Sequence, residues 1–570
     1  MKIPNSPLFL GIALLLAAVP ARSAPTVPPV FFEWFEYTGN DAHFAAPLPA
    51  GSYLNPILAG CYPDPSICRA GQDYYLINSS FVYYPGIPIF RSRDLMHWTQ
   101  LGHVLDRPSQ LKVDGLGASR GVFAPAISYH DGVFYVINTL VDAGGNFFVT
   151  AKDPAGPWSD PVWLPEIDGI DPSFFFDDDG RAYVVNNGPP PGERSLYQGH
   201  RAIWMQEFDP RTQKLTGPRE IIVNGGVDLA KHPVWIEAPH VFKKDGWYYL
   251  ICAEGGTAEE HSEVVFRSRT VRGPYVPWNQ NPILTQRTLD PARPDPITCA
   301  GHADFVETPD GAWWAVFLGC RPYEGNLYNT GRETFLLPVK WTEDGWPVIL
   351  QPGLPVPAVV AGPKLTTGSP ASPETVPFTG NFTWRDEFDG PSLQPVWNLL
   401  RTPHESWFSF TEKPGALALQ PRDVAMGGRG NPSFIGHRQQ HANFAATAAV
   451  RVPTAKGESA GLVAFQNETH YFYLGVRRTR AGVQLFLEQS FAQDHGGTAR
   501  TIAAAEIPAP AAGPVYLKIG ATGRTYAFAY ATTPDAWQTL KADADGSILS
   551  TPVAGGFVGA YLGLYARAEP

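Results

Sequence analysis

The sequence predicts an all-β protein, a five-bladed β-propeller followed by a β-sandwich. Of its 570 residues, 44% are hydrophobic and only 17% are charged, and there are 57 prolines and 56 glycines. This mixture favours many short strands joined by tight turns. The chain also exceeds what one hydrophobic core usually organises, so we expect two domains.

Residues 1–23 have the layout of a secretory signal peptide. Lys2 precedes an apolar run from Leu8 to Val19, and small residues follow it. The run is too short for a membrane anchor. Cleavage after Ala21 and cleavage after Ser23 both fit the small-residue rule. We therefore expect an exported protein, periplasmic or secreted, that has no membrane association once the signal is removed.

A hairpin pattern recurs roughly every 50 to 65 residues and predicts the blades. Each copy is a turn followed by an aromatic strand, and the five copies begin at Gly71, Asp131, Asp179, Asp245 and Asp310. A second element precedes each copy, namely PDPSI, APAIS, DPSFF, EAPHVF and GHADF. Repeats of this length with several strands each predict a five-bladed propeller over residues 52–350.

The repeat predicts which residues meet at the propeller axis. The first strand of each blade runs beside the axis, so residues at equivalent points of the five strands converge. Those residues are Asp64, the Phe123–Ala124 pair, Asp171, Glu237 and His302. Burying three carboxylates together is costly, because desolvation and mutual repulsion both oppose ionisation. We therefore favour a catalytic site, the alternative being loop caps or a structural cation site.

The rest of the chain divides into a linker and a second β unit. Residues 351–383 are rich in Pro, Gly, Ser and Thr and show little periodicity, which is typical of a linker. From residue 384 to 570, segments such as HYFYLGVRR and GVQLFLEQ read as strands of a sandwich. No tight cluster of acids stands out in this unit.

Charge and cysteine content exclude several classes. A net charge of -11 without a Lys/Arg cluster argues against a nucleic-acid partner, and 13% aromatic residues suit a neutral sugar better. No Cys/His spacing suggests zinc. The five cysteines cannot all pair. Cys61 and Cys68 flank Asp64 and are close enough in sequence for a bridge, but we expect buried thiols instead.

Three converging acids suit the hydrolysis of a glycosidic bond with inversion. This reaction needs one protonated acid at the leaving oxygen and one carboxylate that activates water, roughly 6.5–9.5 Å apart. A third carboxylate close to the acid raises its pKa by repulsion, so that it keeps its proton near working pH.

The motifs YPDPSI, GIDPSFFFDDDG and WIEAPHVFKKDGWYYL resemble those of glycoside hydrolase family 43, over residues 55–350. The resemblance implies Asp64 as general base, Glu237 as general acid and Asp171 as the residue that raises the pKa of the acid and orients it. Inversion is implied with these roles. No cofactor is expected to be required.

Further positions of the family are matched by four residues. GHADF implies that His302 lies beneath the sugar, near a calcium site in several members, and GRETF implies that Arg332 binds sugar hydroxyls. A satisfied core histidine and a surface salt bridge are the respective alternatives. Phe81 and Phe123 match aromatic walls around the terminal sugar. Many related sequences have Trp where Phe123 stands, so the wall is smaller here.

The C-terminal unit resembles the concanavalin-like β-sandwich attached to the β-xylosidase and α-L-arabinofuranosidase branch. There the sandwich can close one side of the pocket, whereas a separate carbohydrate-binding role is the alternative. We expect an exo-acting enzyme that releases terminal β-D-xylose from xylan or xylo-oligosaccharides, with α-L-arabinofuranosidase activity plausible. The alternatives are mainly arabinofuranosidase activity on arabinoxylan, hydrolysis of arabinan or fructans, and a sugar-binding propeller without turnover. A homo-oligomer stays open.

Overall fold

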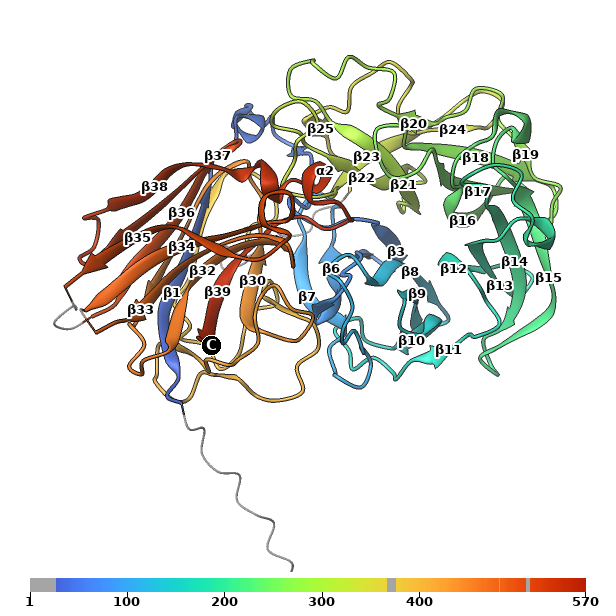
Figure 1. The fold of residues 1–570 in the computed structure, drawn as a ribbon. Coiled ribbons are helices and arrows are strands. Elements are labelled where there is room, and N and C mark those ends of the chain that lie inside the picture. Colours follow the sequence, from blue (N-terminus) through green and yellow to red (C-terminus); the bar gives the residue numbers. More distant parts are fainter. Residues whose placement is uncertain (1–26, 366–375, 481, 509–512, 570) are drawn as a thin grey trace, which may run out of the picture.

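The computed structural model describes residues 27–365, 376–480, 482–508 and 513–569, and strands dominate it. Figure 1 shows two bodies, a ring of small sheets and a layered sandwich. The expected signal peptide lies outside the described residues, as does the middle of the expected linker. Among the described residues, no helix is both long enough and apolar enough to cross a bilayer.

Five antiparallel sheets form the blades, in sequence order, which confirms the predicted propeller. Blade one consists of β3 (Ser66–Ala70), β4 (Asp73–Ile77), β6 (Gly86–Ser92) and β7 (Thr99–Leu105). Blade two consists of β8 (Gly121–His130), β9 (Val133–Val141), β10 (Gly145–Ala151) and β11 (Val162–Trp163). Blade three consists of β12 (Ile170–Phe176), β13 (Ala182–Gly188), β14 (Ala202–Asp209) and β15 (Lys214–Asn224). Blade four consists of β16 (Glu237–Lys244), β17 (Trp247–Glu254), β18 (Ser262–Ser268), β19 (Val276–Pro277) and β20 (Leu284–Thr285). Blade five consists of β21 (Thr298–Glu307), β22 (Trp313–Cys320), β23 (Glu333–Trp341) and β24 (Pro347–Val348).

The first strands of neighbouring blades contact one another around the whole ring, from β3 through β8, β12, β16 and β21 back to β3. The two ends of the propeller are also tied together. Strand β2 (Ser52–Leu54) pairs with β25 (Val359–Ala361), and Leu58 forms a bridge with Thr334 of β23. The inner strands therefore form a closed ring, and their N-terminal ends meet at one end of its axis.

A backbone irregularity at the start of the inner strands aims side chains at the axis. The register shifts between Ile170 and Ser173, between Glu237 and His240, and between Gly301 and Asp304. At each shift, the next residue has a positive φ, namely Asp171 (53°), Ala238 (49°) and His302 (55°). Asp64, two positions ahead of β3, also has a positive φ of 53°. Non-glycine residues adopt this conformation only where the surrounding structure enforces it. The prediction that the three acids and His302 stand at equivalent points is therefore wrong for Glu237. It is Ala238, the next residue, that is equivalent to Asp64, Asp171 and His302.

The sandwich consists of two eight-stranded antiparallel sheets. The first has the order β28 (Phe408–Ser409), β29 (Leu417–Leu419), β1 (Val30–Gly39), β31 (Asn443–Val450), β36 (Val515–Thr522), β37 (Thr525–Ala531) and β38 (Gln538–Asp545). Its eighth strand, β26 (Phe382–Asp386), also pairs with β1. The second has the order β35 (Arg500–Ile507), β34 (Val483–Phe491), β33 (His470–Arg478), β32 (Glu458–Asn467), β39 (Tyr561–Ala568), β30 (Ser433–Arg438), β27 (Asn398–Leu400) and β5 (Tyr83–Tyr84).

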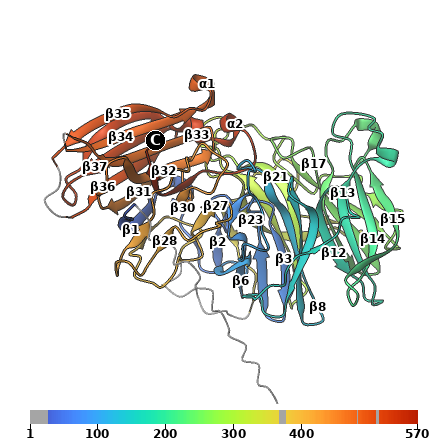
Figure 2. The ribbon, with the colours of Figure 1, turned by 60° about the horizontal axis from the view of Figure 1, so that its bottom comes forward.

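Two strands of the sandwich come from outside its main sequence range. Strand β1 precedes the propeller in sequence yet lies inside the first sheet, with Phe32, Phe35 and Tyr37 buried. Strand β5 lies between β4 and β6 of blade one in sequence yet pairs with β27. Figure 2 shows the sandwich against the side of the ring that carries β6 and β2. Buried side chains of blade one and of the sandwich accordingly form one continuous cluster.

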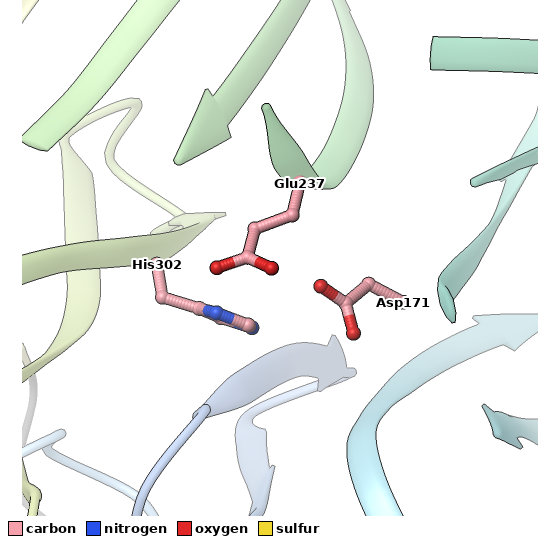
Figure 3. A group of neighbouring side chains, drawn as sticks. All are labelled: Asp171, Glu237 and His302. Carbon is pink, nitrogen blue, oxygen red and sulfur yellow. The ribbon is translucent and has the colours of Figure 1, made fainter. Parts of the chain in front are cut away.

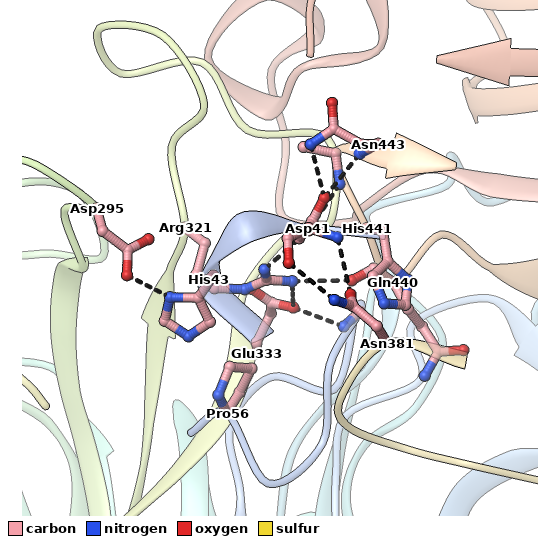
Figure 4. Close-up of polar contacts among 12 residues, drawn as sticks. Asp41, His43, Pro56, Asp295, Arg321, Glu333, Asn381, Gln440, His441 and Asn443 are labelled. Carbon is pink, nitrogen blue, oxygen red and sulfur yellow. Dashed lines mark hydrogen bonds and ion pairs between the residues drawn. The ribbon is translucent and has the colours of Figure 1, made fainter. Parts of the chain in front are cut away.

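A buried charge network also joins the two bodies (Figure 4). The Arg321 guanidinium donates to both carboxylate oxygens of Glu333 (2.6 and 2.8 Å), to Asp41 Oδ2 (3.1 Å) and to the Gln440 carbonyl (2.8 Å). Asp41 also accepts from the backbone N–H of Asn443 at 2.8 Å. One guanidinium therefore links blade five, the segment after β1 and the sandwich. We call this group the Arg321 network.

All five cysteines are free thiols, and only Cys68 is partly exposed. The expectation of unpaired cysteines is confirmed, and the alternative bridge between Cys61 and Cys68 is not formed. Cys61 instead accepts a hydrogen bond from the Gly559 N–H at 3.1 Å. This contact is a further tie between the propeller and the sandwich.

Candidate active site

One pocket of about 550 Å³ lies at the end of the axis where the inner strands begin. Its volume is in the range of small-molecule sites. All seven predicted site residues line it: Asp64, Phe81, Phe123, Asp171, Glu237, His302 and Arg332. The repeat that the sequence displays therefore does bring these side chains together in space.

Asp64 is a buried carboxylate with strong donors on both oxygens. Arg332 Nη1 donates to Oδ1 at 2.8 Å, and Ser79 Oγ donates to Oδ2 at 2.6 Å. His302 Nδ1 lies 3.9 Å from Oδ1. Burial raises the pKa of Asp64, but the charge of Arg332 and the other contacts outweigh it and bring the pKa below its usual value. Asp64 is thus ionised at neutral pH.

Asp171 and Glu237 have the opposite electrostatic character. Figure 3 shows their carboxylates pointing toward each other and toward the His302 ring, and one ligand atom of each lies within 4.8 Å of the others. Burial and the Asp64 charge raise the pKa of Asp171 to about 7, although the Ala238 N–H donates to it at 3.2 Å. Burial, then the charges of Asp171 and Asp64, raise the pKa of Glu237 well above its ordinary value. Glu237 therefore keeps its proton at neutral pH.

His302 is a neutral imidazole beneath these carboxylates, because burial lowers its pKa to about 3. Together with Asp171 and Glu237 it offers two carboxylates and one nitrogen to an ion. Calcium takes six to eight oxygen ligands. These three side chains alone do not complete a calcium shell, so a calcium ion near His302 would need further oxygen ligands and stays a prediction.

Arg332 is buried, with 9% of its side chain exposed, so it is no surface salt bridge. Besides Asp64, its Nη1 donates to Thr257 Oγ1 at 3.1 Å. Its Nε has no partner in the described parts of the chain. Arg332 also lines the pocket, so its guanidinium stands beside the space that a sugar would occupy.

Three phenylalanine rings form one wall of the pocket. Ring centroids lie 5.6 Å apart for Phe81 and Phe123, and 5.7 Å apart for Phe123 and Phe557. Phe557 belongs to the loop before β39, so the sandwich closes one side of the pocket. The Phe557 N–H donates to Ser119 Oγ of the propeller at 2.9 Å, which holds the loop in place.

Among the pocket residues without a counterpart in the sequence prediction are Arg120, Trp235, Thr257 and Phe557. Trp235 stands inside the motif WIEAPHVF, so its nearness to Glu237 was visible in the sequence. Phe557 carried no such signal, because it lies outside the propeller repeat. Only contact between the two domains brings it to the pocket.

Known proteins match both parts of this chain. Residues 53–347 match the model of "Glycosyl hydrolases family 43", and residues 385–569 match "Beta xylosidase C-terminal Concanavalin A-like domain". A xylosidase/arabinosidase of Butyrivibrio fibrisolvens is 41% identical, covering 90% of this chain and 96% of its own. A non-reducing end alpha-L-arabinofuranosidase of Bacteroides ovatus is 38% identical, covering 91% and 92%.

Solved structures agree with these matches. A crystal structure of a GH43_12 protein from a capybara gut metagenome has a TM-score of 0.87 at 41% identity, covering 95% of this chain and all of its own. That of a xylan beta-1,4-xylosidase from Bacillus halodurans has a TM-score of 0.80 at 36% identity, covering 90% and 97%. The family model covers more than half of the chain, and the predicted resemblance is confirmed. This chain belongs to glycosyl hydrolase family 43 and is a glycosidase.

Proposed function

We propose that the chain releases terminal β-D-xylose from the non-reducing ends of xylan or xylo-oligosaccharides, with α-L-arabinofuranose as a second accepted sugar. The observation that carries this proposal is the pocket, which Phe557 closes on one side and which holds one ionised and one protonated carboxyl group. A closed pocket accommodates a chain end, whereas an open groove accommodates a chain interior. The names of the relatives, which include both xylosidases and arabinofuranosidases, support the choice of sugar.

In the proposed reaction, Asp64 takes a proton from a water molecule while that water attacks the anomeric carbon. Glu237 gives its proton to the glycosidic oxygen, which leaves with the rest of the chain. Asp171 keeps the pKa of Glu237 high before the reaction. Arg332 holds Asp64 ionised and donates to the sugar. Attack from the face opposite to the leaving group inverts the anomeric configuration.

Product analysis tests the proposal. The purified chain should release xylose from xylobiose and from an aryl β-D-xyloside, and proton NMR should show α-xylose as the first product. Glu237→Gln should lose most activity on xylobiose and fold normally. Release of arabinose without xylose would contradict the preferred sugar, and β-xylose as the first product would contradict inversion.

A mainly arabinofuranosidic enzyme is the second candidate, favoured by the relative of Bacteroides ovatus. The same assay with an aryl α-L-arabinofuranoside and with arabinoxylan distinguishes the two candidates. The kcat/KM values for the arabinofuranoside and the xyloside show which sugar is preferred. We also propose export, supported by the signal layout of residues 1–23. The N-terminal sequence of the mature protein in the periplasm or culture fluid checks it.

A further inference from the structure

We infer that Trp235 is an additional functional residue, which forms a platform for the sugar on the leaving-group side and orients the acid Glu237. This inference rests on the proposed function and adds to it the residue that recognises the remainder of the substrate. Trp235 acts on the reaction in two ways, by contact with the substrate and through Glu237.

Trp235 lies at the pocket mouth, in the connection between β15 and β16. It lines the pocket together with Glu237, two residues further on, and 36% of its surface is exposed. Its backbone has a φ of 56°, and its N–H donates to the Gly199 carbonyl at 2.8 Å. An exposed indole fixed by its backbone at a pocket mouth is unusual for a purely structural residue. Aromatic faces of this kind pack against apolar sugar faces.

A small framework holds the indole and the acid in one geometry. The Arg201 guanidinium lies over the Trp235 ring, 5.0 Å from its centroid. Arg201 donates through Nε and Nη2 to Asn187 Oδ1, at 3.0 and 2.7 Å. Asn187, which is fully buried, donates through Nδ2 to the carbonyl of Ile236 at 2.5 Å. The residue between Trp235 and Glu237 is thereby anchored, and one face of the indole is occupied by a cation.

Trp235 also lies beside the acid, since it lines the same pocket two residues ahead of Glu237. The Trp235 side chain lowers the pKa of Glu237, against the larger raising effects of burial, Asp171 and Asp64. The other charged or titratable groups near Glu237 are Arg332, His302 and Arg201.

The position of the platform follows from the chemistry of the acid. Glu237 must come within hydrogen-bond reach of the glycosidic oxygen that it protonates. Trp235 lines the same pocket and is far more exposed than Glu237, so its ring lies toward the mouth, beside the sugar that carries this oxygen away. The terminal sugar itself occupies the interior of the pocket, between the phenylalanine wall and Arg332.

Two variants and one control separate these roles. Trp235→Ala removes both the platform and the donor, whereas Trp235→Phe keeps an aromatic face and removes the N–H. Trp163 of β11 is a matched control, because it is 43% exposed, does not line the pocket and packs on Phe147 at 5.0 Å. Each variant is assayed with xylobiose, which has a leaving sugar, and with β-D-xylosyl fluoride, which has none and needs little protonation.

We expect Trp235→Ala to lower kcat/KM for xylobiose roughly 10-fold or more, and for the fluoride by no more than about twofold. Trp235→Phe should keep KM for xylobiose near the wild-type value. The alkaline limb of its pH profile should move to higher pH, because loss of the donor raises the pKa of Glu237. Trp163→Phe should change neither the kcat/KM values nor the alkaline limb of the pH profile.

The outcomes distinguish the two hypotheses. If the wild-type chain hydrolyses neither substrate, the proposed function fails and this inference with it. If the wild-type chain is active but Trp235→Ala and Trp163→Phe have the same ratio of kcat/KM for xylobiose to kcat/KM for the fluoride, the platform role is wrong while the proposed function stands. An unmoved alkaline limb in Trp235→Phe overturns the orienting role.

Discussion

The guanidinium of Arg332 donates to Oδ1 of Asp64 at 2.8 Å, and both side chains are almost completely buried. In such surroundings neither charge is stable alone, since desolvation opposes each of them. The pair therefore maintains an ionised carboxylate at the bottom of a pocket whose other two acids hold their protons more tightly.

Arg332→Gln should move the acidic limb of the kcat/KM profile to higher pH. Loss of the cation raises the pKa of Asp64, so the base becomes protonated at pH values where it is now ionised. At the optimum we expect a loss of roughly 10²- to 10³-fold, since a preorganised donor is removed as well. Arg332→Lys should restore part of the low-pH activity. An acidic limb at the wild-type position would show that other groups keep Asp64 ionised.

Asp64→Asn should reduce kcat by roughly 10²- to 10⁴-fold, the usual contribution of a general base. The amide is close in shape to the carboxylate, but it cannot accept the proton of the attacking water. Ser79→Ala, which removes the hydroxyl that donates to Oδ2 at 2.6 Å, should have a much smaller effect and serves as the comparison. Circular dichroism of both variants checks that the fold is retained. Wild-type turnover in Asp64→Asn would remove Asp64 from the role of base.

Glu237→Gln should stabilise the fold at neutral pH. Folded Glu237 keeps its proton, because its pKa is raised, whereas the unfolded chain releases it above about pH 4.3. Ionisation of the unfolded state thus favours unfolding as the pH rises, and the amide removes this effect. The Tm difference between variant and wild type should grow from about pH 4 toward pH 7. A difference that does not depend on pH would contradict the raised pKa.

Phe557→Ala should weaken the binding of the terminal sugar, because it opens the wall that the sandwich provides. We expect kcat/KM to fall roughly 10-fold, mainly through KM, in line with the loss of an aromatic contact of about 1 kcal/mol or more. Phe408→Ala, in β28 at the edge of the sandwich, is the control for a general effect of truncating a partly buried ring. Equal kinetics in the two variants would remove Phe557 from the sugar site.

Asp41→Ala should lower the free energy of unfolding by about 3 kcal/mol, since it removes one partner from the buried Arg321 network. The control is Asp160→Ala, whose ion pair with Arg107 is largely exposed and should matter by less than about 1 kcal/mol. Chemical denaturation measures both. Equal small losses would show that Glu333 alone satisfies Arg321.

The sequence was sufficient for the parts of the fold that repeat. Five copies of one hairpin placed Asp64, Asp171 and His302 at equivalent points, and the structure brings all three to the pocket. Glu237 reaches the pocket from a position shifted by one residue, since it is equivalent to Ile170 of β12 and Gly301 of β21. A motif comparison in one dimension does not show such a shift.

What the sequence could not show depends on contacts between distant segments. Phe557 approaches the pocket from the sandwich, and Tyr83 and Tyr84, which connect two strands of blade one, extend a sandwich sheet. Each of these contacts joins segments separated by hundreds of residues, and neither end carries a motif for its partner. Local patterns predict strands, whereas the packing of two domains decides which strands become neighbours.

The placement of β1 has a consequence for how the chain is synthesised. This strand leaves the ribosome before any of the propeller, yet its first partner, β26, follows only after more than 300 residues, since β1 ends at residue 39 and β26 begins at residue 382. Until then, a strand rich in aromatic residues has no sheet to join, which is a typical hazard for aggregation. Deleting residues 384–570 would make this condition permanent. An isolated propeller domain should therefore begin after β1, near residue 52, in order to stay soluble.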